Sequence, residues 1–118
     1  LPEGLIVVND GTPLRVVLGN LIANAIRYHD HRKEEKYVRI YHHLTDSSFS
    51  LHVEDNGQGI APEIHAKIFD MFYRGNESSQ GSGLGLYIVK ETLTKLSGSI
   101  QLSSMPRKGS TFSISIPR

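Results

Sequence analysis

Two pairs of stretches in which apolar and polar residues alternate constrain the fold more than any other feature. YVRIYHHL (37–44) and FSLHVEDNG (49–57) are separated by TDSS, and SIQLSS (99–104) and STFSISIP (110–117) by MPRKG. A period of two is typical of a strand with one buried face, and a short polar break between two such strands predicts a β-hairpin. We therefore expect a sheet in which most strands run antiparallel.

Two longer stretches follow the helical period instead. In the first, Thr12 is the predicted N-cap and Pro13 the first helical residue, and one apolar face follows. The second runs from Leu84 to about Leu96, and Gly98 is expected to end it. Each helix has a single apolar face, so both can cover the same face of a sheet.

Shorter elements complete the expected fold. GLIVV (4–8) indicates a strand, and APEIHAKIFDMF (61–72) indicates a short helix. The elements together predict an α/β two-layer sandwich, with a mixed, mostly antiparallel sheet covered on one face by about three helices.

Composition limits the class of protein. With 38% hydrophobic and 21% charged residues, the 118-residue chain is expected to fold as one domain, 1–118. A net charge of +1 indicates neither nucleic acid nor a membrane surface as a partner. The absence of cysteine excludes disulfides and thiolate metal sites. Because the chain starts at LPEG without Met, we expect a fragment of a longer protein.

Asp55 is the residue that fits its strand least well. It follows Phe49, Leu51 and Val53 in the alternation, so its carboxylate falls on the core face. A buried carboxylate is costly without a partner. Taken alone, Asp55 could simply be a turn former before Asn-Gly.

The stretch GSGLGLYIVK (81–90) places glycines directly before an apolar helix. A helix N-terminus exposes unpaired N–H groups that suit phosphate, and glycines allow a close approach. Neither the P-loop string nor the dinucleotide-binding fingerprint is present. The phosphate signal of this stretch is therefore weak by itself.

Four motifs in order give the stretch a context: NLIANAIRY (20–28), DNGQGI (55–60), IFDMFYRG (68–75) and GSGLGL (81–86). This set resembles the GHKL, or Bergerat-fold, ATPases, and most closely the catalytic ATP-binding domain of sensor histidine kinases. GSTFSISIP (109–117) resembles the closing strand of that domain. The resemblance covers essentially the whole chain and implies ATP and Mg²⁺ as cofactors.

The resemblance also implies roles for single residues. Asn24 matches the Mg²⁺ ligand, and Asn20, one turn earlier, would assist the same ion or its waters. Arg27 stands where the family often has Lys and would reach the phosphates. Tyr28 matches an aromatic residue that packs near the adenine. Asp55 matches the carboxylate that accepts a hydrogen bond from the adenine amino group, which would supply its missing donor.

Further positions follow from the same motifs. Phe69 and Phe72 would anchor a lid, the polar loop 74–83, and Arg74 would reach the terminal phosphate. Gly57 and Gly59 would let the chain turn beneath the base, and Thr111 would join the adenine-side polar network. The remaining expected nucleotide contacts are Ile60, Gly83, Leu84, Gly85 and Leu86.

The residue at position 20 separates the branches of this family. Its ATP-hydrolysing members carry a Glu four residues before the metal-binding Asn, whereas Asn20 cannot act as a general base. Phosphoryl transfer is therefore favoured, to a histidine on a separate dimerisation and phosphoacceptor domain of the same protein. A response regulator would act downstream. None of the six histidines has the family's phosphoacceptor setting. The fragment is expected to be cytoplasmic and monomeric.

Other interpretations stay open at this point. The chain could be a binding module that holds adenine nucleotide without transferring phosphate, or an ATP-hydrolysing member of the family. Asn20 and Asn24 could be ordinary exposed helix residues, Tyr28 a helix-end aromatic and Arg74 a solvated loop charge. A histidine metal site is disfavoured, since His42 and His43 point to opposite faces of a strand.

Overall fold

The computed structural model describes residues 11–70 and 84–117. Its elements in order are α2 (Gly11–Arg27), β1 (Val38–Leu44), β2 (Ser48–Asp55), the 3₁₀ helix η1 (Pro62–Ile64), α3 (Gly85–Lys95), β3 (Ser99–Met105) and β4 (Gly109–Pro117). The strand expected at 4–8 lies outside the described residues. No helix in the described ranges combines the length and the apolar character needed to cross a bilayer.

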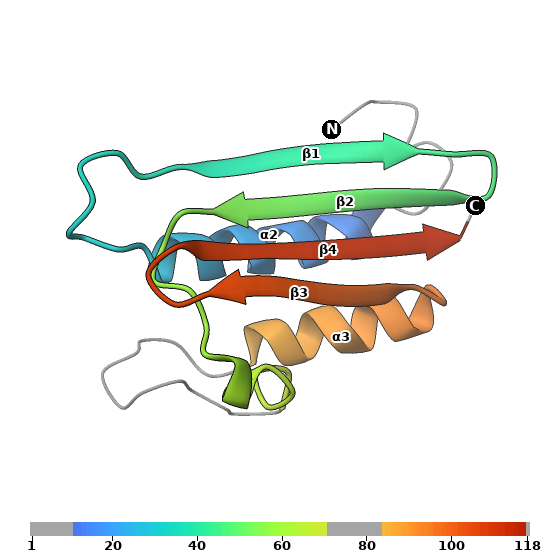
Figure 1. Cartoon of the computed structure of the whole chain (residues 1–118). Coiled ribbons are helices and arrows are strands. Elements are labelled where there is room, and N and C mark those ends of the chain that lie inside the picture. Colours follow the sequence, from blue (N-terminus) through green and yellow to red (C-terminus); the bar gives the residue numbers. More distant parts are fainter. Residues whose placement is uncertain (1–10, 71–83, 118) are drawn as a thin grey trace.

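The described strands form one four-stranded sheet in the order β1-β2-β4-β3, and its three pairings are all antiparallel (Figure 1). Both predicted hairpins, β1–β2 and β3–β4, are present. The central pairing joins β2 to β4, with Asp55 opposite Ser110 and Val53 opposite Phe112. The end of β2 that carries Asp55 therefore lies beside the start of β4.

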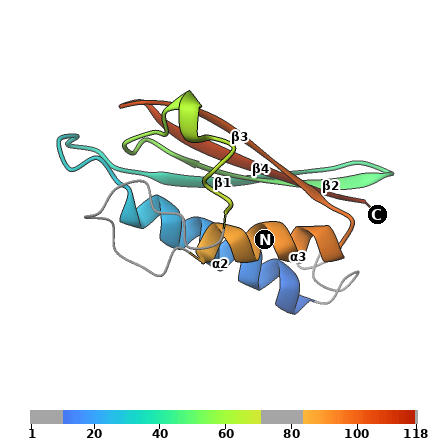
Figure 2. The ribbon, with the colours of Figure 1, turned by 90° about the horizontal axis from the view of Figure 1, so that it is seen from below.

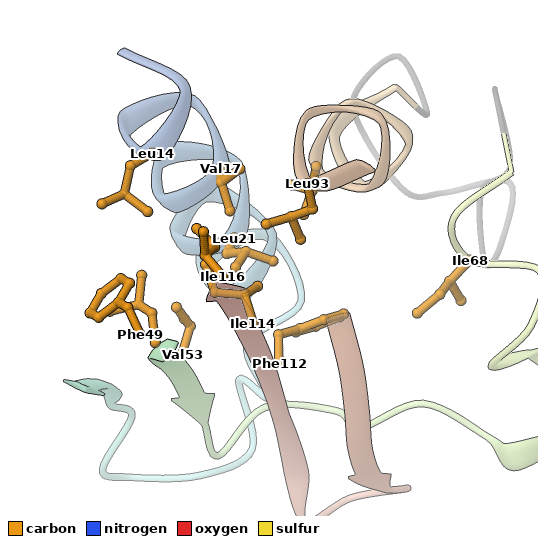
Figure 3. Close-up of a cluster of buried hydrophobic side chains, with 12 residues drawn as sticks. Leu14, Val17, Leu21, Phe49, Val53, Ile68, Leu93, Phe112, Ile114 and Ile116 are labelled. Atoms are coloured by element: carbon orange, nitrogen blue, oxygen red, sulfur yellow. The ribbon is translucent and has the colours of Figure 1, made fainter. Parts of the chain in front are cut away.

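The two α-helices cover one face of the sheet, as Figure 2 shows from below. The core lies between the layers, where side chains of α2 and α3 meet those of β2 and β4 (Figure 3). Its most deeply buried members are Val17, Leu21, Leu51, Val53, Val89, Leu93, Phe112 and Ile114. The α/β two-layer sandwich is thus confirmed, with two α-helices and η1 among the described residues.

The prediction of a helix over 61–72 is wrong for residues 61–70, which are the part that the structure describes. Only Pro62–Ile64 form a 3₁₀ helix, and turns follow to residue 70. Most of the hydrogen bonds here join residues three apart, as from the Lys67 N–H to the Ile64 carbonyl at 2.9 Å. The His65 Nε2 also lies within hydrogen-bond distance of the Ile60 carbonyl oxygen, at 2.9 Å.

Both helix ends differ slightly from expectation. Within the described residues, α2 already includes Gly11 and Thr12, so Thr12 lies in the helix and not at its N-cap. After α3, it is Ser97 and not Gly98 that adopts the left-handed conformation, with φ of 57°. Gly98 serves a different need, because a Cβ atom there would lie 2.7 Å from the Ser115 carbonyl oxygen. The glycine therefore allows the chain to pass close to β4 as it enters β3.

Candidate functional site

One stripe of α2 carries Asn20 and Asn24 on successive turns, and Tyr28 follows directly after the helix, where its N–H donates to the Asn24 carbonyl at 3.1 Å. These three residues are half-buried, whereas Arg27 is exposed. The Asn20 Nδ2 donates to the Val16 carbonyl at 2.8 Å. Its Oδ1 lies toward α3, since a Cβ atom at Gly85 would be 3.2 Å from it. The structure thus places the Asn20 amide oxygen beside the first turn of α3.

Asp55 ends β2 with its side chain on the helix-covered face, and the residue is 9% exposed. Burial raises the pKa of its carboxyl above the ordinary value. The backbone N–H groups of Gly57 and Ser110 and the charge of Lys33 act in the opposite direction. The Gly57 N–H donates to Asp55 Oδ1 at 2.8 Å. The burial cost exceeds what these protein partners offset, so a further donor would stabilise the ionised form.

A hollow of about 290 Å³ borders Asp55. It is lined by Ala25, Ile26, His29, Lys36, Tyr37, Val38, Asp55, Asn56 and Gly57. The residues that α2 contributes are not on the stripe of Asn20 and Asn24, because they are rotated well away from it at 100° per residue. Asp55, Asn56 and Gly57 line this hollow, and Asn20 and Asn24 do not.

Backbone contacts explain the glycines of the 55–60 loop. A Cβ atom at Gly57 would lie 2.5 Å from the Tyr28 carbonyl oxygen, which accepts a hydrogen bond from the Gln58 N–H at 3.0 Å. Gly59 has φ of 75°, and a Cβ there would overlap the Met105 carbonyl. The 55–60 loop therefore packs closely between the end of α2 and the β3–β4 turn, and glycines are needed at positions 57 and 59 for this packing alone.

The register of β4 shows which face of the sheet Thr111 occupies. Phe112 faces the helices, so Thr111 lies on the opposite face of the sheet, and Ser110 shares the face of Asp55. The Ser110 hydroxyl lies 2.7 Å from the Ser104 hydroxyl, which in turn accepts from the Ile60 N–H at 2.8 Å. Sequence reasoning missed Ser110, although the same alternation that placed Phe112 inward also predicts it.

The remaining residues singled out by the motifs divide into two groups. Ile60, Phe69 and Leu86 are partly buried and pack against the core, and Leu84 is half-buried at the N-cap of α3. Phe69 meets Phe112 edge-on, with ring centroids 6.3 Å apart. The second group, together with the polar lid, lies outside the described residues and consists of Phe72, Arg74 and Gly83.

Comparison with known protein families identifies the family of this chain. Residues 9–118 match the model of the histidine kinase-, DNA gyrase B- and HSP90-like ATPases. The chain belongs to this family. The membership confirms the resemblance inferred from the four sequence motifs, and it covers every described element of this ATPase domain.

Relatives of this ATPase domain include sensor kinases. It is 38% identical over 120 residues to the sensor-like histidine kinase SenX3 of Mycobacterium tuberculosis, covering 98% of this chain and 28% of SenX3. It is 36% identical over 122 residues to the phosphate regulon sensor protein PhoR of Haemophilus influenzae, covering 100% of this chain and 28% of PhoR. The chain thus spans just over a quarter of the length of these relatives.

Solved structures share its architecture. The mycobacterial sensor histidine kinase MprB superposes with a TM-score of 0.78 at 27% identity, covering 92% of this chain and 72% of that one. Full-length ShkA in complex with AMPPNP superposes with a TM-score of 0.79 at 28% identity, covering 92% and 22%. The two-layer fold of this ATPase domain is therefore that of sensor histidine kinase structures.

Proposed function

We propose that this domain binds ATP with Mg²⁺ and donates the γ-phosphate to a histidine on a separate dimerisation and phosphoacceptor domain of the same protein. A response regulator would then receive the phosphate, and the domain would act in the cytoplasm as part of a two-component sensor. The observation that carries the choice of transfer over hydrolysis is Asn20. Its amide already donates to Val16 and has no basic site with which to activate water.

Asp55 is the proposed reader of the adenine. Its buried carboxylate has two backbone donors, and the adenine amino group would add a third. A hydrogen bond to an ionised group contributes about 1.5–3 kcal/mol. Guanine presents a carbonyl at the corresponding position, so its oxygen would face the carboxylate oxygens. The site should therefore prefer adenine nucleotides over guanine nucleotides.

The asparagine side of α2 suits a hard cation. Side-chain carbonyl oxygens are ordinary ligands of Mg²⁺, and the Asn20 Oδ1 lies toward the start of α3, where first-turn N–H groups favour phosphate. Asn24 would hold the ion and Asn20 would assist. The ion, when bound, neutralises phosphate charge. Arg27 and the α3 N-terminus would orient the phosphates, and Arg74 stays a prediction from the motif.

Calorimetric titration of the 118-residue chain with ADP and Mg²⁺ tests the proposal. GDP and an Asp55→Asn variant are the controls. We expect saturable binding of ADP, much weaker binding of GDP, and a loss of ADP affinity in the variant. A phosphoacceptor domain supplied with labelled ATP should then gain label. A folded chain that binds no nucleotide would contradict the proposal, and steady phosphate release abolished by Asn24→Ala would favour hydrolysis instead.

The raised pKa of Asp55 predicts a pH dependence of nucleotide binding. A protonated carboxyl loses its charge, so ADP affinity should fall as the pH decreases through a pKa that lies above the ordinary 3.8. For the stability of the chain without nucleotide, the pH dependence that Asp55 causes has the opposite sign. The folded carboxyl holds its proton more tightly than the unfolded one, so this contribution to stability is present at low pH and is lost as the pH rises. Calorimetry across an acidic pH series checks the binding, and an equal decline in Asp55→Asn would contradict the assignment.

A further inference from the structure

Asn56 holds the segment before β1 through three hydrogen bonds. Its Nδ2 donates to the Glu35 carbonyl at 2.8 Å, and its Oδ1 accepts from the Tyr37 N–H at 2.9 Å. Its backbone carbonyl accepts from the Lys33 ammonium at 2.7 Å. An amide side chain offers a donor and an acceptor side by side, so it can bond the carbonyl and the N–H of one extended segment.

The sheet register explains why an amide stands at this point. The β1–β2 ladder stops at the pair Val38 and Asp55, and the next pair in the same register would join Tyr37 to Asn56. The side chain of Asn56 takes the Tyr37 N–H there instead. The backbone can then leave the strand, and the Gly57 N–H comes back to Asp55 Oδ1 at 2.8 Å.

The loop that Asn56 holds is also fixed at its other end. The Arg32 guanidinium binds the Asp30 carboxylate with both a 2.9 Å and a 3.0 Å hydrogen bond, and these hydrogen bonds keep the pKa of Asp30 well below its usual range. Lys33 follows directly. Its positive charge lowers the pKa of Asp55, and its ammonium donates a hydrogen bond to the Asn56 carbonyl. The loop thus connects to the proposed base reader through Asn56.

We infer that Asn56 is a positioning residue that sets the Asp55 carboxylate for base recognition. The inference rests on the proposed function, because it assumes that Asp55 reads the adenine. Without the amide, the Asp55–Gly57 turn is no longer tied to residues 35–37, and the carboxylate can move relative to the base. The selective loss should fall on adenine nucleotides, since guanine gains nothing from an accurately placed carboxylate.

Thr45 provides a matched control on the same hairpin. It lies in the turn at the opposite end of β1 and β2, where its hydroxyl accepts from the Ser48 N–H at 3.0 Å and the Ser47 N–H at 3.3 Å. Thr45→Ala therefore weakens the hairpin without touching Asp55. A purely structural role of Asn56 would make the two variants behave alike toward nucleotides.

The test is titration of the wild-type chain, Asn56→Ala and Thr45→Ala with ADP and with GDP, together with thermal unfolding of each. Asn56→Ala should weaken ADP binding about tenfold, as for one hydrogen bond to a charged group, and reduce the preference for ADP over GDP by the same factor. Thr45→Ala should lower the unfolding temperature and leave both affinities as in the wild type.

Each outcome separates this inference from the proposed function. Wild-type binding of ADP with unchanged affinity and preference in Asn56→Ala would overturn the inference alone, as would equal losses in Asn56→Ala and Thr45→Ala. A folded wild type that binds neither nucleotide would overturn both. If Asn56→Ala does not fold, the isosteric Asn56→Asp replaces it. That variant keeps the acceptor for Tyr37 and loses the donor to Glu35, so it should also show a reduced preference for ADP.

Discussion

Replacing Asn24 by Ala is expected to abolish phosphoryl transfer while the chain stays folded. The substitution removes the amide oxygen proposed to hold Mg²⁺, and loss of one such electrostatic contact lowers a rate by about 100-fold or more. Alanine is favoured in helices over asparagine, so α2 should persist. Phosphotransfer from labelled ATP to a phosphoacceptor domain measures the rate, and circular dichroism measures the fold.

Binding provides a second readout for the same position. In the wild type, ADP affinity should fall when EDTA removes Mg²⁺, and in Asn24→Ala the affinity should no longer depend on the metal. The control is Asn24→Asp, which keeps an oxygen ligand at nearly the same place and should keep the metal dependence. Unaltered metal dependence in Asn24→Ala would show that Mg²⁺ is held elsewhere.

The largest effect on stability is expected for Gly109→Ala, at about 3 kcal/mol of unfolding free energy. Gly109 has φ of 121°, a conformation that L-residues with a side chain rarely adopt. A Cβ atom there would overlap the Asp55 carbonyl and lie 2.8 Å from Asn56 Cα. Because the obstacles are backbone atoms, the strands would have to separate. Urea unfolding monitored by circular dichroism gives the value.

Gly19→Ala is the control for this experiment and should have the opposite sign. Gly19 is an exposed residue within α2, and a Cβ atom there would meet no atom within 4 Å. Alanine should therefore raise the free energy of unfolding by about 1 kcal/mol through helix propensity alone. Equal effects of the two substitutions would mean that the contacts around Gly109 do not constrain the fold.

Local periodicity was sufficient to predict most of the fold. The alternation in 37–55 and 99–117 predicted both hairpins, and the single apolar faces predicted α2 and α3. The error over 61–72 has a physical cause. Ile64 and Ile68 are four residues apart, as in a helix, and both pack against the core. The Ile68 N–H donates to the Ile64 carbonyl at 3.2 Å, but the other backbone hydrogen bonds within 61–70 join residues three apart. The spacing of apolar residues alone does not distinguish an α-helix from a short 3₁₀ helix followed by turns.

The burial of the Asp55 carboxylate was predictable, because Asp55 continues the apolar face of its strand. The role of a residue was not predictable where tertiary contacts decide it. The sequence indicates only that Asn56 is a turn residue. The structure shows that its side-chain amide hydrogen-bonds the Glu35 carbonyl and the Tyr37 N–H. Ser110 was within reach of the alternation argument, whereas its contact with Ser104 depends on how β3 pairs with β4.

The close fit between the 55–60 loop and the β3–β4 turn has a consequence for transplanting parts of this domain. Gly59 faces the Met105 carbonyl, Gly109 faces the Asp55 carbonyl, and the Arg107 N–H donates to the Gln58 carbonyl at 2.6 Å. These contacts are made by backbone, so side-chain changes on one partner cannot compensate for an insertion in the other. A chimera that takes residues 55–60 from a relative must therefore also take residues 105–109, although some fifty positions separate the two segments in the chain.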